Sequence, residues 1–326
     1  MAKISGFNAI HVALDELMTA DEKVVCIGED IGVCGGAWGY FGGLQKKFGE
    51  NRIIQTPITE EGATFAAGGM TYAGYRPIME YMFADFSALA FDPIVNMAAK
   101  ARYLSGGTIK FPMTFIMPQG GGGRSGSQHA QCIEAWFANV PGLKLVAPTT
   151  PSDIRTFLKA AVNDDDPVIF FFARHTLGTS EEVDVEDQST PSLSNAAKIV
   201  KEGKDLTVIA WHAPLIKIVS MVDKIEKETG KSIEIIDPRV LVPLDEEAIY
   251  KSVRKTGRVM IAHDAPERGG FSNIIATGIM ENCFESVKAP IVRVCGYNCV
   301  IPFGTGEDCA YPSAEDIEAG IRKALQ

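Results

Sequence analysis

Long apolar runs are missing from this sequence, and so is any excess of basic residues. No stretch approaches the roughly 18 uninterrupted apolar residues of a membrane-spanning helix. Asp and Glu outnumber Lys and Arg by 41 to 31, which gives a formal charge of −10. Because recognition of nucleic acid depends on clustered basic side chains, we expect neither a nucleic acid nor a membrane as a partner.

Cysteine is sparse and follows no framework. The seven cysteines are an odd number, are widely scattered, and follow no secretory signal at residues 1–10. This pattern favours reduced thiols and a cytoplasmic protein. Cys295 and Cys299 have the spacing of half a metal site, but no second pair of Cys or His at ligand spacing accompanies them. We therefore interpret both as ordinary thiols.

Signs of disorder are absent from the composition. Apolar residues make up 46% and charged residues 22% of the 326 positions, and a chain of this length exceeds what one core usually supports. The acidic, polar stretch from Ser180 to Asp205 is typical of an exposed connection. We therefore expect two domains, residues 1–190 and 191–326, with the boundary near Thr190.

Short apolar runs alternate with helical periodicity in both halves of the chain. The first half predicts strands at 24–28, 77–83, 113–117, 143–148 and 168–172, and helices at 63–72, 93–103 and 153–161. The second half predicts strands at 206–211, 232–236 and 259–262, and helices at 215–228, 245–253 and 271–283. This alternation indicates an α/β fold with two open, mainly parallel sheets. Ligands of such sheets bind beyond the carboxyl ends of the strands.

Two segments beyond these strands carry polar or aromatic groups whose function the pattern leaves open. Glu60 and Glu61 begin a helical stretch, where adjacent acids most often only compensate the positive end of the helix dipole. The aromatic run from Tyr81 to Phe91 is more typical of a core. A flat ring presented at a strand end can nonetheless stack on a heteroaromatic ring.

The segment from Pro118 to Gln131 contains four consecutive glycines, so it must be a loop. A glycine-rich loop can cradle a phosphate, but the spacing matches neither a P-loop nor GxGxxG. His129 is a candidate acid or base because it lies on this polar loop. Among the other histidines only His263 deserves comparison. The acidic run 163–167 is typical of a solvated turn, with an oxygen-rich cation site as the alternative.

Many of these segments together resemble one family, in collinear order and over nearly the whole chain. They are GEDIGVCGG, TPITEEG, YRPIMEYMFADF, FDPIVNMAAKARYLSGG, PQGGGG, QHAQCIEAWFANVPGLKLVAP, DDDPVIFF, EGKDLTVIA, GRVMIAHDAP and APIVRVCG. They resemble the β subunit of the thiamine-diphosphate-dependent 2-oxo acid dehydrogenases of pyruvate, branched-chain and acetoin type. The resemblance implies a transketolase-like pyrimidine-binding domain followed by a smaller C-terminal domain.

The resemblance also implies site residues. The family's glutamate that contacts the aminopyrimidine of thiamine diphosphate falls on Glu60, where a carboxyl group at the ring nitrogen promotes the imino tautomer. The aromatic that stacks on the pyrimidine falls on Phe86. The active-site histidine, which transfers protons or guides a lipoyl arm, falls on His129. Relatives also bind a monovalent cation, K⁺ for example, at positions that fall on Met113, Ala161, Val162, Asp164 and Asp166.

Two departures and one absence qualify this resemblance. Glu61 stands where relatives usually have a small or apolar residue, and QHAQ stands where they more often have HSQ. The chain lacks GDG followed by an NN pair, the signature with which the superfamily holds Mg²⁺ and the diphosphate and which the family's α subunit carries. We therefore expect a chain that is inactive alone.

The resemblance further implies the assembly and the reaction. The expected assembly is an α2β2 heterotetramer, in which this chain meets an α-type subunit and a second β copy. It would decarboxylate a 2-oxo acid and pass the acyl group to lipoyl-lysine on a dihydrolipoyl acyltransferase. Acetoin cleavage, a non-catalytic assembly subunit and a transketolase split into two chains remain alternatives. The presence of Glu60, Phe86 and His129 argues against the assembly subunit.

Overall fold

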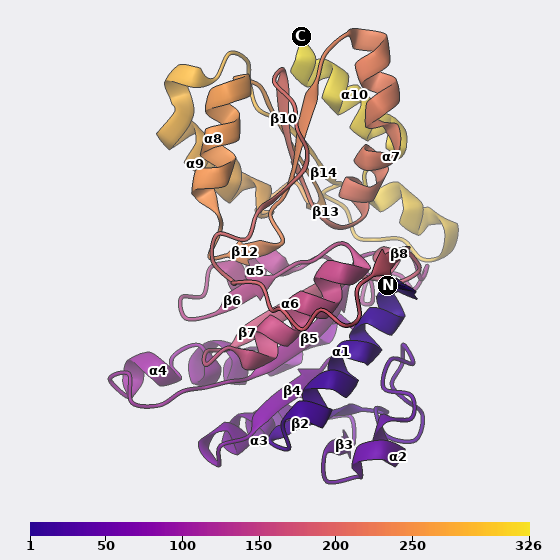
Figure 1. Cartoon of the computed structure of the whole chain (residues 1–326), viewed down its shortest axis with the longest axis vertical. Coiled ribbons are helices and arrows are strands. Elements are labelled where there is room, and N and C mark those ends of the chain that lie inside the picture. The colour runs from indigo at the N-terminus through magenta and orange to yellow at the C-terminus, as the bar shows by residue number, and fades with distance from the viewer.

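Two open sheets are stacked along the long axis of the molecule in the computed structural model, which describes residues 1–326 (Figure 1). The first sheet has the strand order β12-β6-β7-β5-β4-β2-β3. Its strands are β2 (Val24–Glu29), β3 (Ile53–Thr56), β4 (Arg76–Glu80), β5 (Thr114–Gln119), β6 (Lys144–Val146), β7 (Val168–Ala173) and β12 (Val240–Val242). All neighbours are parallel except β12 and β6.

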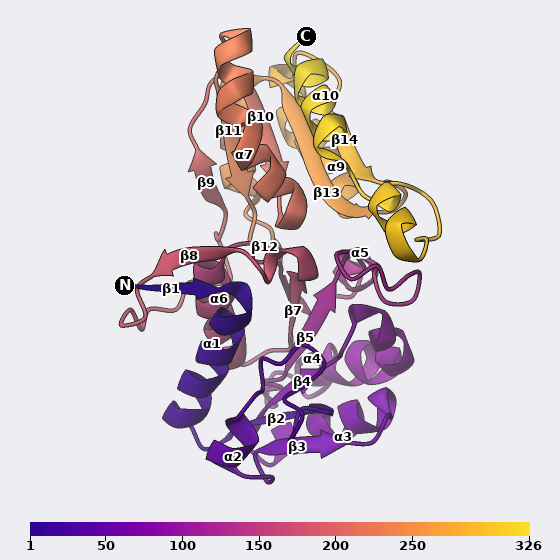
Figure 2. The same ribbon diagram turned by 90° about the vertical axis from the view of Figure 1, so that its right-hand side faces the viewer.

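Helices cover both faces of this sheet, so its central strands β2, β5 and β7 are buried at every residue (Figure 2). Helices α1 (Gly6–Ala20) and α6 (Pro151–Asn163) pack together on one face. Helix α3 (Glu60–Tyr72) packs with η1 (Ala84–Ala90) and η2 (Pro93–Ala98) on the other. The shorter elements are α2 (Leu44–Phe48), α4 (Ala101–Leu104), α5 (Glu134–Ala138) and η3 (Arg174–Thr176).

The second sheet has the strand order β14-β13-β10-β11-β9, parallel except for β9 against β11. Its strands are β9 (Lys198–Lys201), β10 (Leu206–Ala210), β11 (Ile233–Asp237), β13 (Val259–Pro266) and β14 (Val292–Gly296). Figure 1 shows α7 (His212–Thr229) and α10 (Ala314–Leu325) on one face, and α8 (Glu246–Thr256) and α9 (Ser272–Cys283) on the other. The turns η4 (Phe284–Ser286) and η5 (Gly304–Ala310) complete this part of the chain.

Two connections tie the parts of the chain together. β1 (Ala2–Ser5) pairs antiparallel with β8 (Ser180–Val183). β12 returns from the second half of the chain to the edge of the first sheet. We propose that the chain changes domain between β8 and β9, a stretch that includes Thr190. None of the helices combines the length and the apolarity that crossing a bilayer requires.

The predicted α/β class with mainly parallel sheets is confirmed, but the single helix predicted over 93–103 is wrong. The chain forms the π-helix η2 and then the separate helix α4. The N–H group of Ala99 donates to Ile94 O, five residues earlier, at 3.0 Å. The break lies where the backbone at Gly142 approaches, since a Cβ atom there would lie 1.9 Å from Ala99 O.

Candidate active site

The carboxyl ends of β2, β3, β4 and β5 lie at one edge of the first sheet, because these strands are parallel neighbours. Glu29 ends β2, and Glu60 begins the helix that follows β3. Phe86 lies in η1 after β4, and His129 lies in the loop after β5. The fold therefore collects at this edge the three residues expected to serve the cofactor, as Brändén's rule for open sheets requires.

His129 is half-buried against two aromatic rings. The centroid of its imidazole lies 4.6 Å from that of Phe83 and 5.2 Å from that of Phe86, both in edge-to-face geometry. The two phenylalanine rings are 5.8 Å apart, also edge to face. The N–H group of His129 donates to Gly126 O at 3.2 Å. These contacts orient the imidazole on a loop that has no strand or helix of its own.

Glu60 is buried in the first turn of α3, where its side chain is 8% exposed. Thr64 Oγ1 donates to Glu60 O at 2.6 Å and lies 2.6 Å from the hydroxyl oxygen of Tyr81. Burial raises the pKa of the Tyr81 hydroxyl, and the nearby charge of Glu60 adds to this effect. Glu61 is exposed, so this departure from the family pattern leaves the buried surroundings of Glu60 unchanged.

Sequence reasoning missed two further acids beside Glu60. Burial, with a further contribution from the charge of Glu60, raises the pKa of the Glu29 carboxyl, whose Oε1 is buried without a hydrogen-bond partner. Glu80 ends β4, is 1% exposed, and accepts from the Tyr40 hydroxyl at 2.7 Å. The signal that could have found them is an acid that closes a wholly apolar strand. Together Glu29, Glu60 and Glu80 form an acid cluster at the sheet edge.

Glu80 predicts a pH dependence of stability. Burial raises the pKa of its carboxyl to about 8, so the folded state keeps a proton that the unfolded chain loses near its ordinary value. The contribution of Glu80 to the free energy of unfolding is then full at low pH and falls as pH rises towards 8, by up to roughly 1.4 kcal/mol per pH unit. Glu80→Gln should become more stable relative to wild type between pH 5 and 8 in urea unfolding. Parallel pH curves for the two proteins would contradict this.

The residues expected to bind a monovalent cation lie together at the amino end of β5, away from the acid cluster. They are Met113, Ala161, Val162, Asp164 and Asp166. Arg76 Nη1 donates to the main-chain oxygens of Val162 and Asp164 at 3.1 and 3.0 Å. Lys144 Nζ donates to both carboxylate oxygens of Asp164 at 2.7 Å. Protein cations therefore already supply positive charge to this acidic turn.

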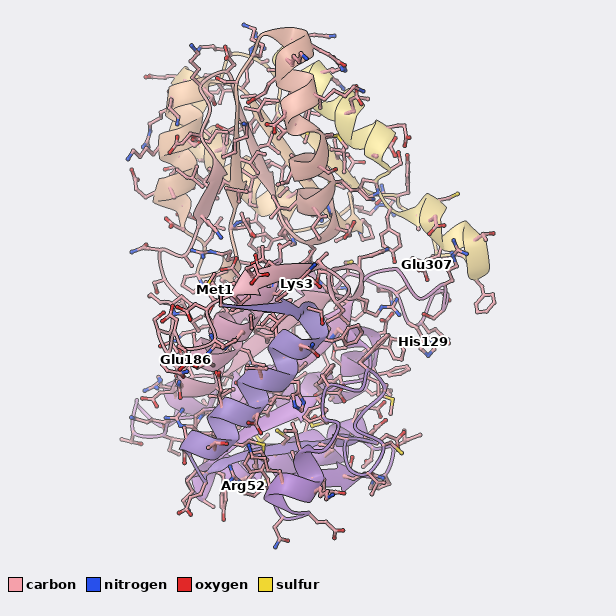
Figure 3. The ribbon with its side chains drawn as sticks, turned by 45° about the vertical axis from the view of Figure 1, so that its right-hand side comes forward. Met1, Lys3, Arg52, His129, Glu186 and Glu307 are labelled. Atoms are coloured by element: carbon pink, nitrogen blue, oxygen red, sulfur yellow. The ribbon has the colours of Figure 1, made fainter.

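The glycine-rich loop does not offer its amides to a phosphate. The backbone N–H groups of Gly122, Arg124 and Ser125 donate to the carboxylate of Glu307, at 2.7, 3.0 and 3.0 Å. Figure 3 shows Glu307 and His129 on the same side of the molecule, with Glu307 above. The anion at this loop is therefore a side chain from the C-terminal part of the chain, which the sequence pattern did not reveal.

Two weaker candidates have structural settings. His263 is fully buried and stacks on Trp211 with ring centroids 4.9 Å apart and planes 4° apart. Burial lowers the pKa of His263 to about 3, so its ring stays neutral. Cys295 and Cys299 are free thiols. No group of three or more His, Cys, Asp or Glu side chains is arranged to hold a metal ion.

Comparison with known proteins gives matches over almost the whole chain. Residues 2–179 match the family model "Transketolase, pyrimidine binding domain" and residues 195–317 match "Transketolase, C-terminal domain". The 2-oxoisovalerate dehydrogenase subunit beta, mitochondrial, of Dictyostelium discoideum is 42% identical over 92% of this chain and 81% of its own length. The pyruvate dehydrogenase E1 component subunit beta of Bacillus subtilis is 35% identical over 100% of both chains.

Among solved structures, the chain is similar to "Split gene transketolase, inactive beta4 tetramer". The TM-score is 0.79 at 24% sequence identity, covering 99% of this chain and 98% of the other. At this level of identity the likeness demonstrates a shared fold and nothing more.

Proposed function

Because the chain belongs to the family of E1 β subunits of thiamine-diphosphate-dependent 2-oxo acid dehydrogenases, we propose that it forms the pyrimidine-binding half of an active site completed by an α-type subunit. The observation that carries the proposal is the edge of the first sheet, where the buried Glu60, the ring of Phe86 and the imidazole of His129 follow neighbouring parallel strands.

The residues at this edge fit the aminopyrimidine of thiamine diphosphate. Glu60 supplies a buried carboxyl for a ring nitrogen. Glu29 Oε1 is buried and lacks a partner, which suits a donor such as the exocyclic amino group. Phe86 is half-buried, so one side of its ring is free to stack on the heterocycle.

Each residue then has a stated task in the reaction. Thiamine diphosphate, when bound, supplies a thiazolium carbon that adds to the 2-oxo group and accepts the electrons left by departing carbon dioxide. Glu60 holds or releases a proton at the pyrimidine nitrogen, and Phe86 keeps water from one face of that ring. His129 moves a proton at the oxygen derived from the 2-oxo group, or meets the incoming lipoyl arm.

The diphosphate and Mg²⁺ are assigned to the partner in this proposal. The absence of GDG followed by an NN pair supports that assignment. The family context implies an α2β2 assembly with a second β copy, and a dihydrolipoyl acyltransferase as the acceptor of the acyl group. Phosphate binding within this chain has little support, since Glu307 occupies the amides of the glycine-rich loop.

Reconstitution with an α-type chain tests the proposed reaction. Pyruvate, branched-chain 2-oxo acids and acetoin would be offered in turn, with dihydrolipoamide acylation and ketol transfer measured in parallel. We expect acyl-lipoamide to form from one of these substrates. Ketol transfer alone would favour a split transketolase, and an assembled complex without either activity would favour a non-catalytic subunit.

We propose separately that K⁺ binds at Met113, Ala161, Val162, Asp164 and Asp166. Support comes from the carbonyl oxygens of Val162 and Asp164, each of which keeps a second lone pair beside Arg76. A cation that binds only the folded state raises its stability. The thermal midpoint should therefore be higher in KCl than in choline chloride at equal ionic strength. Equal midpoints would mean that Arg76 and Lys144 alone neutralise this turn.

We also propose a cytoplasmic location, supported by seven cysteines that are all free thiols. One matched relative carries the word mitochondrial in its name, so an organelle is the competing location. Fractionation of the source cells, with detection of this chain by a specific antibody, decides between the two.

A further inference from the structure

The loop that carries His129 is attached to the C-terminal part of the chain at several points. We call residues 120–131 the histidine loop. The carboxylate of Glu307 accepts from the amides of residues 122, 124 and 125. The hydroxyl of Tyr311 donates to Ala130 O, and the N–H group of Gly304 donates to Arg124 O at 3.2 Å. These anchors lie on both sides of His129 in the sequence.

The burial of Glu307 is exceptional within its segment. η5 is mostly exposed, and only Glu307 and Ala310 are buried in it, with Glu307 0% exposed. An ionised carboxylate in such a place is strongly unfavourable unless hydrogen bonds and a counter-charge compensate it. Three amide donors satisfy both oxygens of Glu307. Its burial therefore depends on one specific conformation of the histidine loop, and the dependence is mutual.

Arg174, at the end of β7, holds the same loop from the other domain. Its Nε donates to Gly120 O at 2.7 Å and its Nη1 donates to Ser125 Oγ at 3.1 Å. The guanidinium lies over the ring of Phe83, 5.3 Å from the centroid, and so also contacts the aromatic wall of His129. Burial lowers the pKa of Arg174 and the charge of Glu307 opposes this shift. The loop thus lies between a buried cation and a buried anion.

The glycines of the loop are explained by this arrangement. A Cβ atom at Gly121 would lie 2.5 Å from the ring of Tyr311, and one at Gly122 would lie 3.1 Å from the ring of His175. Gly122 also has a φ of +103°, which side chains other than hydrogen disfavour. Only a backbone without side chains lets η5 and Tyr311 approach this closely. The glycine run therefore serves an internal contact between domains.

We propose that Glu307 and Tyr311 are positioning residues that fix the histidine loop and thereby place the imidazole of His129 at the active site. The inference rests on the proposed function for the role of His129, but not for the clamp itself. The C-terminal domain then contributes to catalysis without touching substrate or cofactor, because a displacement of about 1 Å at a reacting group can lower turnover by about 10²-fold.

Two variants and one matched control test this in the reconstituted complex. Glu307→Gln keeps the size of the side chain but turns an NH₂ group towards a backbone N–H group. Tyr311→Phe removes only the hydroxyl that donates to Ala130 O, so it keeps the test decisive if the first variant fails to fold. Asp308→Asn is the control, because Asp308 is the next residue of η5 and makes only an exposed ion pair with Arg124.

The readouts are amide hydrogen exchange over residues 120–131, kcat, and the affinity for thiamine diphosphate. For Glu307→Gln we expect exchange about tenfold faster at residues 122–125 and kcat lower by about tenfold or more, with cofactor affinity within about twofold of wild type. Tyr311→Phe should act in the same direction with smaller size at residue 130. Asp308→Asn should match wild type.

Unchanged exchange in both variants would overturn the clamp, and so would faster exchange with unchanged kcat. A complex in which His129→Ala retains full turnover would instead refute the proposed role of His129, while the exchange data would still decide whether Glu307 and Tyr311 order the loop. The two failures are therefore distinguishable.

Discussion

Replacing Glu60 by Gln should lower the turnover of the reconstituted complex by about 10²- to 10⁴-fold, the usual contribution of a positioned acid or base. Glutamine has nearly the same shape, so the helix start at α3 should be preserved. It cannot hold and release the proton that the pyrimidine nitrogen requires. Because Glu60 is buried beside Glu29, water is poorly placed to substitute for it.

Glu61→Gln is the matched control for this experiment. Glu61 is adjacent, is of the same type and is exposed, so its replacement should leave turnover within about twofold, as for most surface substitutions. Steady-state rates at saturating substrate and cofactor measure both variants. Equal rates for Glu60→Gln and wild type would favour a non-catalytic assembly subunit.

Replacing His129 by Ala should lower turnover by about 10²-fold or more. The imidazole is held at 4.6 and 5.2 Å from the rings of Phe83 and Phe86, at the same sheet edge as Glu60, and no neighbouring residue of the loop offers another ionisable ring. Gln128→Ala is the control, since Gln128 precedes His129 and is exposed. Single-turnover decarboxylation, measured separately from lipoamide acylation, would locate the loss.

The two possible tasks of His129 give different patterns in that experiment. A proton-transfer role lowers the decarboxylation step, whereas a role in meeting the lipoyl arm leaves decarboxylation intact and lowers acylation. Full rates in both steps would show that the imidazole is dispensable.

The strands and the fold class could be predicted because they depend on local pattern. The apolar run at 168–172 becomes β7, buried at every residue, and the alternation with helices implies a parallel sheet. The assignment of Glu60, Phe86 and His129 came from the collinear resemblance to a family, since spacing alone favoured helix-dipole and core functions for the first two.

The remaining features depend on tertiary contacts between distant segments. Glu307 lies more than 170 residues from the glycines it binds, and nothing in its own segment distinguishes it from a surface acid. Arg76 approaches the cation residues from another strand, and Gly142 approaches Ala99 from another loop. No periodicity encodes these contacts, so only the folded chain reveals them.

The central claim is that this chain holds only the pyrimidine half of the cofactor and needs a second polypeptide for the rest. Calorimetric titration of thiamine diphosphate and Mg²⁺ into the isolated chain, and into the chain mixed with its α-type partner, tests it directly. We predict no measurable binding or turnover for the isolated chain and stoichiometric binding with turnover for the mixture. Binding and turnover by the isolated chain would contradict the account.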